Sequence, residues 1–241
     1  MIQFWELRSL DQNTRAKIMQ RAETDIRSLL PLAQEVIDNV HEKGDAAVVE
    51  YTRKYDAANF EANMLRAKPD DFARARAEVG PDVVAAIEQA HENIYRFHRE
   101  QLPEPMWFTE VQPGIMAGEK VTPVTSAGLY VPRGKGAFPS VMLMLATPAQ
   151  VAGVPRIVVV SPPTPEGTPD AGSLVAAEIC GVTDFYVVGG IQAVAALAYG
   201  TETIPKVDKI IGPGAVQPPQ HQVEKSVGSR QAAGLQPAAC W

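Results

Sequence analysis

Hydrophobic residues follow two different periods along this chain. Up to about residue 102 they recur every three or four positions, as they do on one face of an α-helix. This spacing predicts a helix that ends near residue 18 and further helices over residues 29–40, 46–55 and 81–97. Ser9 or Asp11 can cap the first helix. Gly44 and Asp45 separate the second from the third, and Pro81 suits the first turn of the last.

Between residues 107 and 124 the pattern changes to short apolar runs broken by glycine and proline. Such runs are typical of short strands joined by turns, so this segment predicts one or two β-hairpins.

From Ala127 onward, strand-like apolar runs alternate with helical segments. Strands are predicted at residues 127–131, 156–160, 184–188 and 209–211, and helices at 140–152, 171–179 and 191–199. Gly153, Gly181 and Gly200 fall just past the helices, where glycine is favoured. The alternation predicts βαβ units with right-handed crossovers, and hence an α/β fold with a Rossmann-like parallel sheet. Ligands of such sheets bind at the carboxyl ends of the strands.

These patterns divide the chain into three parts. Residues 1–106 form a helical region that packs on the core or on a dimer partner, and residues 107–214 form the Rossmann-like portion. Residues 215–241 are rich in Gln, Pro, Ala and Ser and have no apolar period, so we interpret them as disordered or as an out-of-frame ending. The fold is then truncated, and an unpaired sheet edge would favour aggregation.

One stretch, from Ser126 to Gly153, has the layout of an anion-binding unit. A buried strand is followed by a loop at 132–139 that holds two glycines, Arg133 and Lys135, and then by an almost wholly apolar helix with Ser140 at the N-cap position. Backbone N–H groups at such a helix start can face an anion. The loop is neither G-x-G-x-x-G nor a P-loop, so an ordinary strand-to-helix connection remains the alternative.

Composition narrows the class of protein. The chain has 241 residues, of which 46% are hydrophobic and 21% charged, so it can bury a substantial core. Its net charge of -6, without a basic run, argues against nucleic acid as a partner. Two cysteines fit a reducing compartment. Because it shows neither a secretory signal nor an apolar run long enough for a bilayer, we expect a cytoplasmic protein without a membrane partner.

Few side chains suggest chemistry on their own. His91 and His98 lie seven apart on one predicted helix, but nothing in their spacing supplies further metal ligands, so surface or packed histidines are the simpler interpretation. Cys180 ends an apolar helical face and is interpreted as a core residue. Tyr130 ends a predicted central strand, and Gln192 follows Gly189-Gly190 in the first turn of a helix. Either can contact a cofactor, or Tyr130 can be a core aromatic and Gln192 solvent-exposed.

Three segments, taken together with their spacing, are far more specific than any one of them. They are AGLYVPRGKGAFPSVMLMLATPAQVAGV (127–154), RIVVVSPPTPEG (156–167) and VVGGIQAVAALAYGTETIPKVDKIIGPG (187–214). From about Gly128 to Gly214 the chain resembles the histidinol dehydrogenase family. The resemblance is less specific in the helical N-terminal region and ends at Gly214.

The resemblance implies an NAD-dependent oxidoreductase of histidine biosynthesis. Family members oxidise L-histidinol to L-histidine, are zinc-dependent homodimers, and have Rossmann-like domains without the usual glycine fingerprint. Their NAD contacts correspond to Tyr130 in GLYVP and Gln192 in GGIQA. A third contact, an Asn directly after GPG, is replaced by Ala215, and Arg133 stands where many members have glycine.

The resemblance also implies what lies outside this chain. The family's zinc ligands, its Glu–His catalytic pair and most substrate contacts follow the GPGN segment, and His221 and Glu224 are not in that sequence context. No catalytic or metal residue is therefore assigned here, and we expect little or no turnover by the chain alone. Three alternatives stay open: a dehydrogenase of another small polar alcohol, a non-catalytic fragment that binds nucleotide or pairs with a full-length subunit, and a frameshift after codon 214.

Overall fold

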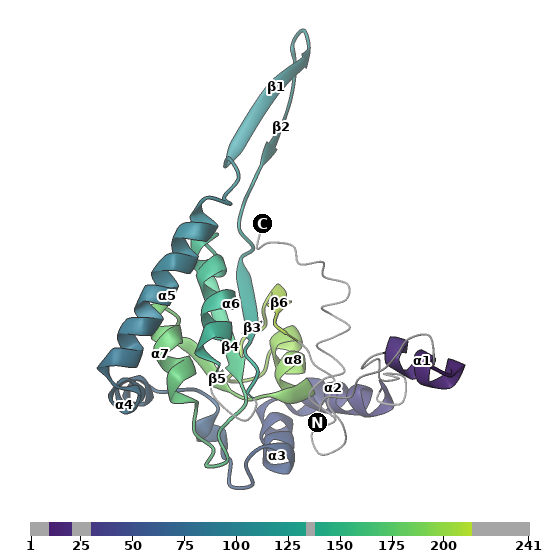
Figure 1. The fold of residues 1–241 in the computed structure, drawn as a ribbon, viewed down its shortest axis with the longest axis vertical. Helices are drawn as coiled ribbons and strands as arrows, with labels where there is room; N and C mark the ends of the chain where they lie inside the picture. The colour runs from purple at the N-terminus through teal and green to yellow at the C-terminus, as the bar shows by residue number, and fades with distance from the viewer. Residues whose placement is uncertain (1–9, 21–29, 134–137, 214–241) are drawn as a thin grey trace.

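The computed structural model describes residues 10–20, 30–133 and 138–213 of the chain (Figure 1). The elements in order are α1 (Gln12–Gln20), α2 (Leu30–Lys43), α3 (Asp45–Tyr55), the 3-10 turn η2 (Ala62–Met64), α4 (Pro69–Val79), α5 (Pro81–Arg99), β1 (Met106–Gln112), β2 (Ile115–Lys120), β3 (Ser126–Tyr130), α6 (Pro139–Val151), β4 (Arg156–Ser161), α7 (Ala171–Ile179), β5 (Asp184–Val187), α8 (Gly190–Tyr199) and β6 (Lys209–Ile211). The expected alternation of strands and helices is confirmed. None of the described helices is long and apolar enough to cross a membrane.

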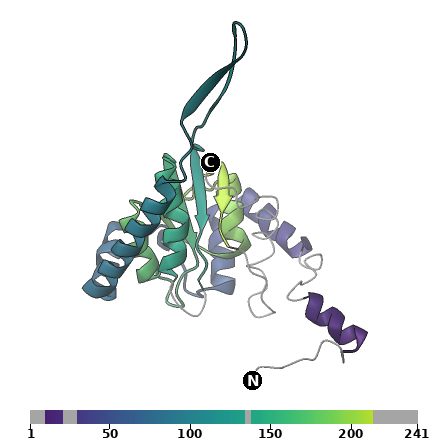
Figure 2. The same ribbon diagram turned by 45° about the horizontal axis from the view of Figure 1, so that its top comes forward.

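The four later strands form one parallel sheet in the order β5-β4-β3-β6. The first two crossovers, through α6 and α7, carry the chain outward from β3 to β5, and α8 then returns it to the other side of β3. Because crossovers are right-handed, this reversal places α8 on the opposite face of the sheet from α6 and α7. Figures 1 and 2 show these helices on the two sides of the strands.

Both faces of this sheet are buried. The inner stretches of β4 and β5 are almost free of solvent exposure, from Val158 to Ser161 and from Phe185 to Val187. Their sequences are continuous apolar runs and not alternating ones, as expected of strands that are covered on both sides.

The N-terminal helices form an outer layer on each side. α5 packs on α6 and α4 on α7, whereas α2 and α3 pack on α8. Their buried side chains belong to the same hydrophobic cluster as those of the strands. The helices before the sheet therefore complete its cover.

One edge of the sheet is protected by a short segment after η2. The N–H of Ala67 donates to the carbonyl of Phe185 at 2.9 Å, and the N–H of Val187 donates to the carbonyl of Leu65 at 2.8 Å. These antiparallel bonds cover the outer side of β5. The outer side of β6 has no partner strand among the described residues.

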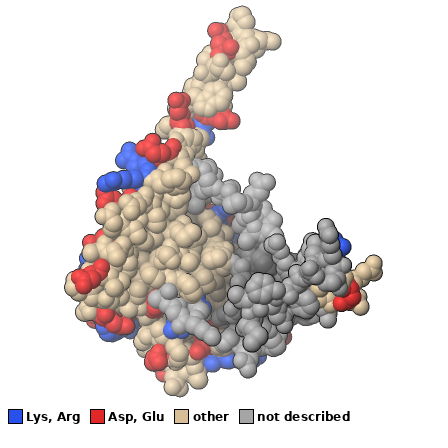
Figure 3. Space-filling model, viewed as in Figure 1, with Lys and Arg blue, Asp and Glu red and all other residues tan. Residues whose placement is uncertain are grey.

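The predicted hairpin is confirmed as β1 and β2, which pair only with each other and project from the body (Figure 1). Every residue of both strands is exposed, and the surface of the hairpin in Figure 3 is mostly uncharged. Its large apolar side chains are Met106, Trp107, Phe108, Val111, Ile115 and Met116. No other described element covers these side chains. An isolated two-stranded hairpin is only marginally stable in water, so this hairpin lacks the packing that ordinarily stabilises strands.

The start of α6 differs from the prediction. Phe138 occupies the N-cap position and Pro139 the first helical turn, so Ser140 lies inside the helix and does not cap it. The reason is that proline has a fixed φ and no N–H, and therefore fits the first helical position, where the N–H would have no partner anyway.

A carboxylate pair fastens the turn between α2 and α3 to the loop after α8. Gly44 turns the chain with φ +55°, and Glu202 Oε2 accepts the N–H of Asp45 at 2.7 Å. The carboxylate of Asp45 in turn accepts the hydroxyl of Thr201 at 2.5 Å and the hydroxyl and N–H of Thr203. These bonds join segments more than 150 residues apart in the sequence.

A second carboxylate joins the start of β3 to the start of its neighbour β6. Asp208 Oδ2 accepts the hydroxyls of Ser126, at 2.7 Å, and of Thr125, and the N–H of Asp208 donates to the Ser126 hydroxyl. The hydroxyl of Thr125 is the largest cause of the lowered pKa of Asp208. Folding therefore favours the ionised form of this carboxyl group.

We predict that Gly44→Ala destabilises the protein more than Gly80→Ala. Both glycines have positive φ, which costs an alanine about 1–3 kcal/mol. Only at Gly44 would the new Cβ also lie 2.2 Å from Glu202 Oε2, whereas nothing lies within 4 Å at Gly80. Moving Glu202 aside removes the bond to Asp45, which adds about 1 kcal/mol. Urea unfolding measures both variants. In a Glu202→Ala background the excess cost of Gly44→Ala should vanish, and an unchanged excess contradicts the explanation.

We predict that the stabilisation by Asp208 depends on pH. Because its folded-state pKa is lowered, the contribution is complete above the ordinary aspartate pKa of about 3.9 and is lost as the pH falls through the lower folded value. Asp208→Asn should therefore be less stable than the parent at pH 7, and the difference should shrink below about pH 4. Urea midpoints measured across this range test it, and a difference independent of pH would contradict it.

Candidate functional site

The reversal of strand order at β3 defines a switch point between β3 and β6. In parallel sheets, ligands bind in the crevice outside the carboxyl ends of the strands at such a point. Tyr130 is the last residue of β3, and Gly212 follows β6 directly. A Cβ on Gly212 would lie 2.5 Å from the carbonyl oxygen of Tyr130, so only glycine allows the two strand ends to come this close.

Tyr130 reaches from its strand to the start of α8. A Cβ on Gly128 would meet Leu197 of α8, and Tyr130, two residues on, therefore faces the same side of the sheet. Its hydroxyl accepts the N–H of Gly190 at 3.2 Å. Gly190 has φ +68°, which favours glycine, and it is the first residue of α8.

Gln192 lies at the same turn and is buried, with 1% of its surface exposed. Its Oε1 has no hydrogen-bond partner among the described residues, and a Cβ on Gly190 would lie 2.6 Å from it. The alternative of a solvent-exposed glutamine is therefore wrong. The structure brings the two predicted residues, Tyr130 and Gln192, together at the Gly189–Gly190 turn.

Two further residues at this edge were not predicted as site residues. Ser161 ends β4 with 2% of its surface exposed, and its hydroxyl has no partner among the described residues. Arg133 follows β3, and its Nε is buried and equally unpaired, while its Nη1 donates weakly to the carbonyl of Pro163 at 3.4 Å. The signal for Ser161 in the sequence is that it is the one polar residue that ends the run IVVVS.

The same carboxyl edge therefore carries three buried polar atoms without partners: Gln192 Oε1, Ser161 Oγ and Arg133 Nε. Such atoms are rare in folded proteins, because each costs free energy when it leaves water without a new hydrogen bond. Two donors and an acceptor at one strand edge suit a polar ligand. The loop residues 134–137, which include Lys135, lie outside the described residues.

The remaining predicted candidates lie elsewhere. Cys180 is a buried core residue whose pKa is raised by burial, which keeps the thiol protonated and unreactive. His91 contacts Gln150 Oε1 at 3.0 Å and His98 contacts Gln101 Oε1 at 2.7 Å, so each ring has its own neighbour. Among the described residues no group of three or more His, Cys, Asp or Glu side chains is placed to hold a metal ion. Ala215, His221, Glu224 and Cys240 lie outside the described residues.

The chain matches the family model of histidinol dehydrogenase over residues 19–234. It belongs to the histidinol dehydrogenase family. The match includes the helices α2 to α5 and extends past Gly214, where the resemblance in the motifs ends.

Two relatives show how similar this chain is in sequence to other members of the family. The chain is 50% identical over 200 residues to a histidinol dehydrogenase of Synechocystis, an alignment that covers 83% of this chain and 46% of that protein. It is 47% identical over 214 residues to "Histidinol dehydrogenase homolog 2" of Mesorhizobium japonicum, which covers 89% of this chain and 49% of the relative.

A solved structure shares the fold. The crystal structure of histidinol dehydrogenase from Elizabethkingia anophelis superposes with a TM-score of 0.78 at 30% identity, and covers 92% of this chain but 50% of that chain. The chain thus spans about half the length of the relatives it matches.

We predict that Ser161→Ala leaves the stability of the protein unchanged or raises it, because the variant removes a buried hydroxyl without a partner. The matched control is Thr52→Val, which removes a buried hydroxyl that donates to the carbonyl of Val48 at 2.8 Å. That variant should lose about 1 kcal/mol. Urea unfolding compares the two, and an equal loss in both would show that the Ser161 hydroxyl is bonded.

Proposed function

We propose that the carboxyl edge of the sheet binds NAD, and that the chain is the dinucleotide-binding portion of a histidinol dehydrogenase. The observation that carries the proposal is the concentration of unpaired buried polar atoms at the switch point, next to the turn that joins Tyr130 to α8. Family membership supports the reaction class, oxidation of an alcohol.

The residues at this edge fit a dinucleotide. The ring of Tyr130 and the amide of Gln192 would hold one part of it, since the amide both donates and accepts. Arg133 and Ser161 would add donors to an anionic or hydroxyl-bearing part, and Gly189 and Gly190 let the backbone come close to it. NAD supplies the hydride acceptor. The residues named here bind and orient it.

The rest of the machinery is proposed to lie outside this chain. The described residues do not fit a zinc site, and we infer that the zinc ligands and the catalytic pair are supplied by the half of the family's length that this chain does not span. We accordingly propose that the chain by itself does not oxidise L-histidinol. A cytoplasmic homodimer of the intact enzyme remains part of this proposal.

A second candidate function is oxidation of another small polar alcohol. Four relatives of 38–47% identity carry the name histidinol dehydrogenase homolog instead of histidinol dehydrogenase, at identities that overlap those of the named enzymes. The relatives of this chain therefore include proteins whose names state no substrate. We expect the residues that contact the substrate to lie outside the described residues.

We predict that the chain binds NAD weakly and that Gln192→Met weakens this binding about fivefold or more, because it removes a hydrogen-bonding amide worth about 1 kcal/mol. Stability should stay unchanged or rise, since Oε1 has no partner among the residues that the structure describes. Titration calorimetry with NAD, alongside urea unfolding, measures both. Gln150→Met, an exposed helix position that contacts His91, is the control and should leave NAD binding unchanged. Equal binding by both variants contradicts the assigned site.

A chimera tests the function. We predict that residues 1–213 of this chain, joined at the aligned position to the remaining half of the Synechocystis enzyme, oxidise L-histidinol with NAD, whereas the chain alone does not. Growth of a histidine auxotroph and NADH formation report the result. A soluble, NAD-binding chimera that oxidises only other small alcohols would favour the second candidate. Turnover by the unfused chain would overturn the inference that the catalytic half is missing.

A further inference from the structure

A cavity lies at the opposite end of the sheet from the proposed NAD edge. It has a volume of about 830 Å³, within the range of small-molecule sites. Val182 and Thr183, which line it, directly precede β5, so the cavity opens at the amino end of that strand. Tyr130 and Gln192 lie at the carboxyl ends, and the cavity is thus separate from the site described above.

The walls combine apolar surface with positive charge. Phe72 of α4 and Val182 supply apolar side chains, and the charged residues are Arg66, Lys68 and Glu178. Arg76, which does not line the cavity, already holds Glu178 at 2.9 Å and Glu88 at 2.8 Å. The one acidic side chain of the wall is therefore neutralised from outside.

The two cationic side chains of the wall, Arg66 and Lys68, have fewer carboxylate partners than positive charges. Arg66 and Arg156 share a single carboxylate, that of Asp184, at 2.7 and 3.3 Å. The ammonium group of Lys68 has no hydrogen bond or ion pair with the residues the structure describes.

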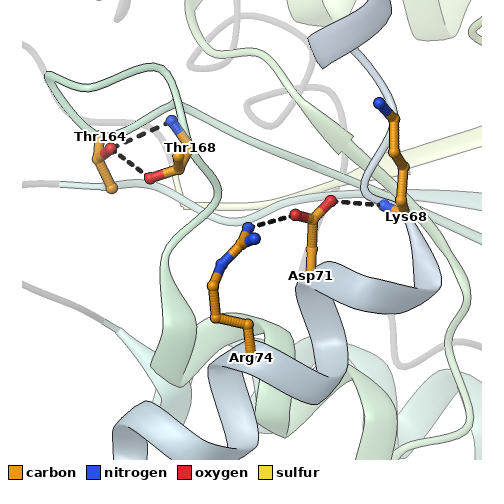
Figure 4. A network of polar contacts seen from close by, with 5 residues as sticks. All are labelled: Lys68, Asp71, Arg74, Thr164 and Thr168. Carbon is orange, nitrogen blue, oxygen red and sulfur yellow. Dashed lines mark hydrogen bonds and ion pairs between the residues drawn. The ribbon is translucent and has the colours of Figure 1, made fainter.

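The nearest carboxylate in sequence does not neutralise Lys68 either. Asp71 accepts the backbone N–H of Lys68 at 2.7 Å and pairs with Arg74. In Figure 4 the side chain of Lys68 extends away from this pair. An anion in the cavity would thus meet an ammonium group without a partner among the described residues, and a guanidinium that shares its carboxylate with Arg156.

We propose that this cavity binds a small organic anion: a carboxylate on a flat apolar body that packs against Phe72 and Val182. The apolar wall favours the body through burial, and Lys68 with Arg66 selects the negative charge. A cationic ligand of the same shape would meet like charges and be rejected.

Binding would also strengthen the contact between the outer helices and the sheet. The cavity is walled by α4 on one side and by the end of α7 on the other, and Thr203, whose hydroxyl is bonded to Asp45, completes it. A ligand that binds only the folded state raises the unfolding temperature, and the rise grows with the logarithm of the ligand concentration above its Kd.

The test uses the 241-residue chain and 2-naphthoate as the probe, with titration calorimetry and thermal unfolding as readouts. We expect a Kd on the order of 1 mM or tighter, given about a dozen heavy atoms, and a rise in unfolding temperature. Lys68→Met should weaken binding about fivefold or more. Asn63→Trp places a large side chain at an exposed position of the wall, and it should fill the cavity and abolish naphthoate binding.

Matched controls separate this site from the first. Lys54→Met removes a lysine that lies over the ring of Tyr55, outside the cavity wall, and should leave binding unchanged. The cation 2-naphthylmethylammonium should not bind, and saturating NAD should not displace naphthoate. Equal affinity of Lys68→Met and the parent, or binding of the cation, would overturn the proposal without affecting the proposed function. Displacement by NAD would also overturn it, because both ligands would then share one site, and Gln192→Met would tell whether that site is the carboxyl edge.

Discussion

A parallel sheet whose strands are apolar on both faces has no side that can meet water, and this constraint organises the molecule. The crossovers cover one face with α6 and α7 but the other with α8 alone. α2 and α3 complete the second face, and α4 and α5 thicken the first. The bonds of Asp45 and Glu202 fasten this added layer to the loop that returns from α8 to β6. The N-terminal helices are thus part of the core and not an appendage.

The reversal that lets both faces be covered also makes the proposed binding edge. The carboxyl ends of β3 and β6 meet at the switch point, the place where ligands of parallel sheets bind. Gln192, Ser161 and Arg133 keep buried polar atoms there that have no partner in the described part of the chain. Such atoms lower the stability of the free protein, and a polar ligand that bonds them recovers that free energy on binding.

Periodicity predicted the strands and the helices around them well, because burial on both faces leaves continuous apolar runs that are easy to locate. It could not place Tyr130 beside Gln192, 62 residues later, because that contact follows from strand order, and the assignment came from the family resemblance. The burial of Gln192 was missed because an amide in a first helical turn is ordinarily exposed. The protection of β5 by Leu65–Ala67 was missed because three residues show no period.

The weak nucleotide signal of the sequence has a physical explanation in the same contacts. In a usual dinucleotide fold the close approach of backbone to ligand occurs at the first strand-to-helix turn, where the glycine motif lies. In this chain the glycine turn at the proposed binding edge is Gly189–Gly190, after the third strand of the sheet in sequence. Tyr130 bridges the difference, since its side chain runs from the end of the first strand to the N–H of Gly190. A search for a glycine motif only after the first strand of the sheet therefore overlooks the Gly189–Gly190 turn, although the hydrogen bond of Tyr130 holds that turn close to the end of this strand.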